Sequence, residues 1–172
     1  MLTKKMEDAL CAQINAEYWS AYLYLSMSAH FVKAGYPGMG NWLRIQAKEE
    51  NTHAAKFFDY VLERDGKVLL MPIAAVPHSW ENPLVAFEEV LKHEQKITSL
   101  INNLMQVAVE EKDFACQSML KWFIDEQVEE EGNVKEILDS VRMVQGNGNG
   151  MFMIDRELRQ RVFVDSTVSS AT

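Results

Sequence analysis

Four long stretches of the chain carry apolar residues three and four positions apart and contain few helix breakers. This spacing predicts helices at residues 3–33, 38–65, 83–111 and 114–145, with Asp113 as the N-cap of the last. A short fifth helix is expected at residues 151–161, after the turn signal GNGNG. The pattern therefore predicts an all-α fold.

The connections between these segments restrict how the helices can be arranged. The first two segments are joined by a few residues and the last two long ones by almost none, so each pair should pack antiparallel. Residues 66–82 contain two prolines and cannot be helical. Fully extended at about 3.3 Å per residue, they reach ~55 Å. A helix of about 28 residues is only ~42 Å long. We therefore expect a four-helix bundle with one long crossover and a short fifth C-terminal helix.

Composition limits the class of protein. With 172 residues, 48% of them apolar, the chain is expected to form one domain over residues 1–165, followed by a disordered polar tail at 166–172. The net charge of −8 favours binding of cations over nucleic acid. No stretch approaches the ~20 apolar residues of a membrane span. Cys11 and Cys116 are isolated and read as reduced, buried thiols, so we expect a cytoplasmic protein without membrane or nucleic-acid partners.

Several polar residues interrupt the apolar stripes near the middle of each long helix. The spacing from Glu17 to Glu50 equals that from Glu94 to Gln127. Antiparallel helices of similar length bring their midpoints to one height. The residues expected to converge there are Glu17, Glu50, His53, Glu94, Gln127 and Glu130.

Such a cluster needs positive charge. Burying an unpaired ion costs several kcal/mol, and these stripes carry no Lys or Arg. Taken singly, each glutamate is explained as well by a place at the rim of the core as by a metal-ligand role. His53 is explained as well by a hydrogen-bonded place in the core. Together, they favour two divalent cations bridged by shared carboxylates. Oxygen ligands with one imidazole suit iron, and manganese remains open.

The motifs around these residues resemble those of the bacterial non-haem ferritins over essentially the whole chain. They read AEYWSAYLYLS, AKEENTHA, HEQ and WFIDEQVEEEGN, and the likeness continues through GNGNGMFMIDREL. The resemblance implies an intra-subunit diiron site. Its first iron would be held by Glu17, Glu50 and His53, with Glu50 bridging. Glu94 and Glu130 would hold the second iron, with Gln127 nearby.

The resemblance also implies residues around the diiron site. One implied feature is a third iron site formed by Glu49, Glu126 and Glu129, with Glu130 able to reach both the second and the third iron. The alternative is that these residues form a solvated acidic face. Tyr24 and Trp122 resemble a tyrosine and a tryptophan that could donate an electron during oxygen reduction. Packing in the core explains these two aromatic residues equally well.

The function implied is iron storage with ferroxidase activity. Fe(II) would be oxidised by O2 or hydrogen peroxide, and Fe(III) stored as a hydrated oxide inside a shell of twenty-four chains. Subunit contacts are expected at the exposed apolar residues Trp19, Tyr22 and Met27 and at the apolar crossover, and such patches also fit a smaller oligomer. Asn51 stands where haem-binding bacterioferritins have Met, so no haem is expected. The alternatives are a peroxidase-like diiron oxidoreductase with a permanent cofactor, a shell without oxidase activity, and a purely structural helical protein.

Overall fold

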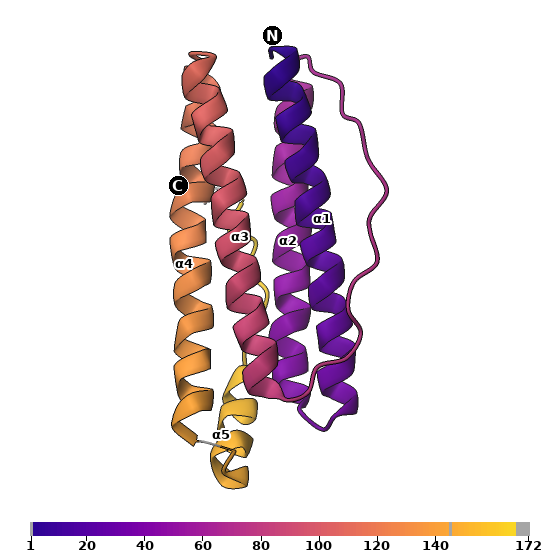
Figure 1. Ribbon diagram of the computed structural model, residues 1–172, viewed down its shortest axis with the longest axis vertical. Helices are drawn as coiled ribbons and strands as arrows, with labels where there is room; N and C mark the ends of the chain where they lie inside the picture. Colours follow the sequence, from indigo (N-terminus) through magenta and orange to yellow (C-terminus); the bar gives the residue numbers. More distant parts are fainter. Residues whose placement is uncertain (1, 145, 168–172) are drawn as a thin grey trace.

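The computed structural model describes residues 2–144 and 146–167, and this part of the chain forms five helices and no strand (Figure 1). They are α1 (Lys4–Lys33), α2 (Pro37–Glu63), α3 (Pro83–Glu110), α4 (Phe114–Val144) and α5 (Gly148–Leu158). The predicted all-α fold is confirmed. The fifth helix begins three residues earlier than expected. Its N-terminus is capped by Asn147, whose side-chain oxygen accepts a hydrogen bond from the backbone N–H of Gly150 at 3.0 Å.

The long helices form two antiparallel pairs, α1 with α2 and α3 with α4 (Figure 1). Gly35, at φ 92°, turns the chain between the first pair, where a left-handed backbone favours glycine. Between the pairs, the segment after α2 runs without helix along the outside of α1 to the start of α3 (Figure 1). The predicted long crossover is therefore confirmed.

The helix ends explain how α5 is attached. Asp113 caps α4 as predicted, because its side chain accepts from the N–H of Cys116 at 3.0 Å. The N-terminus of α2 has no such cap of its own. Asp155 of α5 takes this role and accepts from the N–H of Met39 at 2.8 Å. A side chain at Gly38 would place its Cβ 1.6 Å from the carbonyl oxygen of Asp155, so glycine permits this contact.

The buried apolar residues form two clusters along the bundle. One includes Phe31, Trp42 and Phe87 and reaches Met151 of α5. The other includes Leu10, Phe57 and Phe123, towards the opposite end. The six polar residues singled out above lie in the helices between these clusters, and all six are buried. The bundle thus surrounds a polar layer with apolar packing on either side.

The structure also bears on the predicted cysteines, exposed apolar residues and C-terminal tail. Cys11 and Cys116 are free and buried, as predicted. The expectation that Met27 is exposed for subunit contacts was wrong, because its side chain is 1% exposed and packs in the core. Tyr22 is 54% exposed. Residues 168–172 of the expected tail lie outside the described residues, whereas Ser166 donates a hydrogen bond to Glu126 at 3.0 Å. None of the helices described is both long and apolar enough to cross a membrane.

Candidate metal centre

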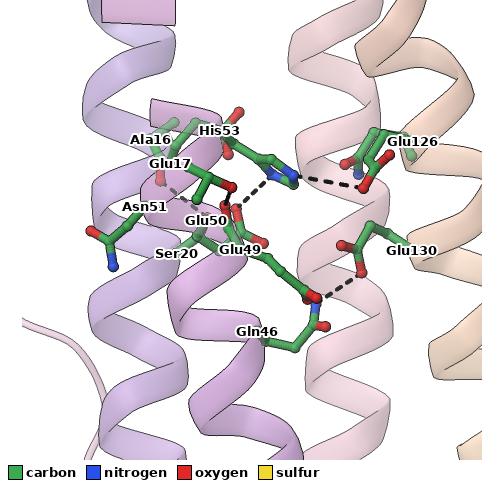
Figure 2. Close-up of polar contacts among 12 residues, drawn as sticks. Ala16, Glu17, Ser20, Gln46, Glu49, Glu50, Asn51, His53, Glu126 and Glu130 are labelled. Atoms are coloured by element: carbon green, nitrogen blue, oxygen red, sulfur yellow. Dashed lines mark hydrogen bonds and ion pairs between the residues drawn. The ribbon is translucent and has the colours of Figure 1, made fainter. Parts of the chain in front are cut away.

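Six buried polar residues from all four long helices meet at mid-bundle. Glu17 comes from α1, Glu50 and His53 from α2, Glu94 from α3, and Gln127 and Glu130 from α4. Each is at most 4% exposed. Figure 2 shows His53 between the carboxylates of α1 and α2 on one side and those of α4 on the other. Within the described chain, this layer holds the ligand types that a hard divalent cation prefers.

One group of candidate ligands consists of Glu17, Glu50 and His53. One ligand atom of each lies within 4.8 Å of the others. His53 Nδ1 lies 3.6 Å from Glu50 Oε2. Glu17 Oε1 accepts a hydrogen bond from Gln13 Nε2 at 2.8 Å, whereas Glu17 Oε2 is buried and has no hydrogen-bond partner among the described residues. A buried acceptor left in this state makes Glu17 Oε2 a candidate ligand for a cation.

A second group consists of His53, Glu126 and Glu130. His53 Nε2 lies 3.8 Å from Glu126 Oε1, and it too is buried without a hydrogen-bond partner in the described structure. From the sequence, Glu126 was expected only at a third, outer site. Here Glu126 faces the same imidazole as the first group. His53 therefore connects two sets of carboxylates, one through each ring nitrogen.

Glu94 belongs to neither group. Its Oε1 accepts a hydrogen bond from the Tyr24 hydroxyl. Gln127 Nε2 lies 3.2 Å from Glu94 Oε2 and from the backbone oxygen of Glu94, and 3.3 Å from Thr98 Oγ1. Gln127 therefore acts here as a donor to Glu94, not as an oxygen ligand. A cation that uses Glu94 competes with these donors for its oxygens.

The outer acidic residues differ in their environment. Glu49 is half-buried and pairs with Arg161, whose Nη2 lies 2.7 Å from Glu49 Oε2. Glu129 is exposed and belongs to neither ligand group. The structure therefore does not bring Glu49, Glu126 and Glu129 together as one group. A third iron site built from these residues stays a prediction.

Two residues that the sequence analysis missed touch this region. Gln46 Nε2 donates to Glu130 Oε2 at 2.8 Å, and Arg161 donates to Gln46 Oε1. A signal for Gln46 was present in the sequence. It stands four residues before Glu50, as Gln13 stands four residues before Glu17, so both amides share a helix face with a core carboxylate. No periodic pattern pointed to Arg161.

The two aromatic residues predicted near the centre lie beside it. Tyr24 is fully buried and contacts Glu94 through its hydroxyl. The Trp122 ring lies 5.6 Å from the His53 ring, edge on, and Lys56 Nζ lies 4.5 Å from its centroid on the outer side. Both residues are thus close enough to the ligands to take part in electron transfer, and both also pack as core residues.

Burial sets the electrostatics of the carboxylates. It raises the pKa of Glu17 to about 8, with the Glu50 charge adding to the effect. Burial likewise raises the pKa of Glu50 to about 7, despite the nearby imidazole. The pKa values of Glu94 and Glu130 are also raised, first by burial and then by the charges of Glu130 and Glu49 respectively. At neutral pH, carboxylates of the metal-free cluster therefore hold protons, and a bound cation would supply the positive charge in place of these protons.

His53 shows the complementary effect. Burial by itself would lower its pKa, but the carboxylates of Glu126 and Glu50 outweigh burial and raise the pKa well above its usual value. The imidazolium is thus the positive charge that both groups share without metal. Metal ligands must be deprotonated, so a cation that binds here replaces the proton on His53 and releases it to solvent.

The fold and the cluster define a class of protein. A four-helix bundle with one long crossover and candidate carboxylate and imidazole ligands on facing helices is the arrangement for which the ferritin-like proteins are the standard examples. The family model described as "Ferritin-like domain" matches residues 7–144.

Known proteins agree with this class. The chain is 40% identical over 161 residues to the bacterial non-heme ferritin of Bacteroides fragilis, covering 94% of this chain and all of that one. It is 36% identical over 166 residues to the bacterial non-heme ferritin of Staphylococcus saprophyticus, covering 96% and 99%. An engineered closed form of the Archaeoglobus fulgidus ferritin superposes with a TM-score of 0.94 at 43% identity, covering 95% of this chain and all of that one. The chain belongs to the ferritin family, and the resemblance to bacterial non-haem ferritins is confirmed.

Proposed function

We propose that this protein stores iron and oxidises Fe(II) at the mid-bundle cluster before storage. The observation that carries the proposal is His53, which faces Glu50 through Nδ1 and Glu126 through Nε2, with its Nε2 atom left without a hydrogen-bond partner. Glu17 Oε2 is the second such buried atom. Two groups of hard ligands around one imidazole suit two ferrous ions close together.

The residues divide this task. Glu17, Glu50 and His53 bind the first ion, because their ligand atoms already lie within 4.8 Å of one another. Glu130 serves the second ion, with Glu126 in the arrangement observed and with Glu94 once Tyr24 or Gln127 releases it. Glu50 is placed to bridge. The cluster accepts net positive charge readily, since the pKa values of Glu17 and Glu50 show how unfavourable their uncompensated charges are.

The chemistry requires two ions at a time. Each Fe(II) that becomes Fe(III) gives up one electron, so a pair supplies the two electrons that, with two protons, convert O2 to hydrogen peroxide. Hydrogen peroxide can accept two further electrons from another pair. Tyr24 and Trp122 are the proposed sources of an additional electron, because one contacts Glu94 and the other lies edge on to His53.

Storage requires that the oxidised ions leave. Gln127 brings no charge to the second position, and Glu94 is already bonded to Tyr24 and Gln127, so the second ion is held less tightly than the first. Loose ligation suits a substrate in transit. A permanent cofactor, as in a peroxidase-like oxidoreductase, calls for tight ligation at both positions. This asymmetry favours storage over that alternative.

The proposed assembly is a shell of twenty-four chains in the cytoplasm, with a third ion passing near Glu49, Glu126 and Glu129 and no haem. Support comes from the ferritins of similar sequence, and from the apolar side chains that the crossover exposes. Leu70 is 63% and Met71 62% exposed. Surfaces of this kind mark protein–protein contacts. Residues 1–165 are proposed as one ferritin-like unit.

The test is aerobic addition of several hundred Fe(II) per shell to the metal-free protein. O2 uptake, the colour of ferric oxide and the size of the particle are followed together. The proposal predicts fast oxidation and a clear amber solution in which iron and protein elute as one large particle. Precipitated iron, or oxidation no faster than in buffer, would contradict it. Oxidation that stops after about two Fe(II) per chain, with iron retained in the bundle, would favour the permanent cofactor.

A further inference from the structure

The C-terminal segment after α5 lies along α2 in an extended conformation. From Arg161 to Thr167, partly buried and exposed residues alternate, and the odd-numbered ones are partly buried. Asn41 of α2 anchors the start of this segment. Its Nδ2 donates to the backbone oxygens of Leu158 and Arg159 at 3.3 Å, and to that of Arg161 at 3.0 Å. The segment is thus held where Arg161 can reach the metal centre.

Arg161 is built into this position by contacts on several sides. Its guanidinium lies 4.7 Å from the Trp42 ring centroid. Nη2 donates to Glu49 Oε2 at 2.7 Å, and Nη1 donates to Gln46 Oε1. Arginine keeps its charge at all relevant pH values and stacks readily on aromatic rings. Arg161 is therefore a permanent cation beside the carboxylates of Glu49 and Glu130.

Arg161 also decides how Gln46 is oriented. A guanidinium can only donate, so Gln46 must turn its oxygen towards Arg161. Its NH2 group then faces Glu130, to which it donates at 2.8 Å. Arg161 thereby engages two carboxylates, Glu49 directly and Glu130 through Gln46. Without Arg161, Gln46 could rotate and offer its oxygen to a cation at Glu130.

We propose that Arg161 sets the cation affinity of the outer side of the metal centre. It occupies Glu49 Oε2 and keeps a hydrogen-bond donor on Glu130, so a divalent cation at these oxygens competes with it. This inference rests on the proposed function, because it assumes that the cluster binds cations. Cation binding and the Arg161–Glu49 contact weaken each other equally. The contact lowers the affinity for the cation by the same factor by which the cation weakens the contact. Arg161 is a positioning residue that favours release of the outer ion.

Zinc titration of the metal-free full-length protein tests this, because Zn(II) occupies such ligands without oxidation. Calorimetry should resolve a tighter binding class at Glu17, Glu50 and His53 and a weaker class at the outer carboxylates. In Arg161→Gln, we expect the weaker class to tighten by at least about fivefold, and the tighter class to stay unchanged. Arg159→Gln is the matched control, because Arg159 lies in the same segment and is exposed. It removes the same charge and should shift the weaker class less than about twofold.

The double variant Arg161→Gln with Glu49→Gln should lose the gain, since a neutral amide cannot attract the cation as Glu49 does. A zinc-soaked crystal of the unaltered protein supplies a second readout, in which the Arg161 guanidinium should have left Glu49. An unchanged weaker class in Arg161→Gln, an equal shift in Arg159→Gln, or zinc bound at Glu49 with Arg161 in place would overturn the inference while leaving the proposed function intact. Absence of any zinc binding to the unaltered protein would overturn both.

Discussion

His53 Nε2 lies 3.8 Å from Oε1 of Glu126 in α4, although His53 itself belongs to α2 and to the Glu17–Glu50 group. One imidazole therefore connects the inner and outer carboxylates across the two helix pairs. In the proposed site, one ring nitrogen of His53 serves the first ion and the other donates its N–H to a carboxylate, so changes at His53 should affect both sets of carboxylates.

Replacing His53 by Ala should slow the fast oxidation of the first two Fe(II) per chain by at least about tenfold. Loss of a residue that only hydrogen-bonds to a metal ligand already lowers activity by about tenfold or more, and loss of a direct ligand should cost at least as much. Stopped-flow absorbance after adding two Fe(II) per chain measures the rate, and size-exclusion chromatography checks assembly. His78→Ala is the control, since His78 is exposed in the crossover. Equal rates in His53→Ala and the unaltered protein would remove His53 from the site.

The metal-free protein should become less stable as pH rises from 6.5 to 8.5. The pKa of Glu17 is about 8 in the folded state against 4.5 for an ordinary glutamate, so the folded state holds a proton that the unfolded chain has released. Stability therefore falls through this window. The raised pKa of His53 acts in the same direction. His93, with a pKa lowered to about 4 by burial, acts oppositely, but between these pH values it adds back only about 0.4 kcal/mol.

We expect Glu17 alone to lower the free energy of unfolding by roughly 2 kcal/mol between these two pH values, and Glu50, Glu94 and Glu130 to add to this fall. Urea titrations at both values measure it. Glu17→Gln should flatten the dependence, because the amide cannot ionise and Gln13 can still donate to its oxygen. A stability that rises with pH in the unaltered protein, or an identical slope in Glu17→Gln, would contradict the assignment of this charge to Glu17.

Gln127→Glu should destabilise the metal-free protein by about 2 kcal/mol, because it replaces the donors to Glu94 with a second buried carboxylate. Saturation with Zn(II) should reduce the difference, since a cation binding the folded state offsets the added charge. Denaturant titration with and without Zn(II) measures both quantities. Gln95→Glu adds the same charge at an exposed position of α3 and should change little. An equal loss in both variants would mean that Gln127 is not specifically bonded to Glu94.

Tyr24→Phe should abolish a tyrosyl radical signal when Fe(II)-loaded protein is mixed with O2 and frozen within a second. The reason is that the Tyr24 hydroxyl is bonded to Glu94, so the phenol can pass an electron to the centre and its proton to that carboxylate. Electron paramagnetic resonance measures the signal. Tyr22→Phe, at a residue 54% exposed, should retain it. A full-sized signal in Tyr24→Phe, or no radical in the unaltered protein, would exclude this role.

Much of the fold could be predicted from the sequence, because each long helix carries its own apolar stripe and its own end signals. Asp113 caps α4 as expected, and the six core polar residues meet because the helices share a midpoint. The grouping of ligands could not be predicted in the same way. Whether Glu94 or Glu126 faces the centre depends on side-chain rotamers, and these are set by hydrogen bonds from Tyr24 and Gln127 across helices.

Arg161 was missed for a different reason. It lies in a non-helical segment, where no period links its position to the bundle. Its placement depends on long-range contacts at Asn41 and Asp155, neither of which is marked by composition or spacing. The absence of Lys and Arg from the core stripes was a sound observation. A further cation, Arg161, comes from the chain after α5 and pairs with Glu49 beside the cluster.

Anomalous diffraction at the iron edge tests the central claim most directly. Crystals of the metal-free protein would be soaked anaerobically with Fe(II), and difference maps recorded on either side of the edge. The account predicts one iron peak among Glu17, Glu50 and His53, and a second, weaker peak on the Glu130 side of His53. Iron confined to the surface, with no peak within bonding distance of Glu17 or His53, would contradict it.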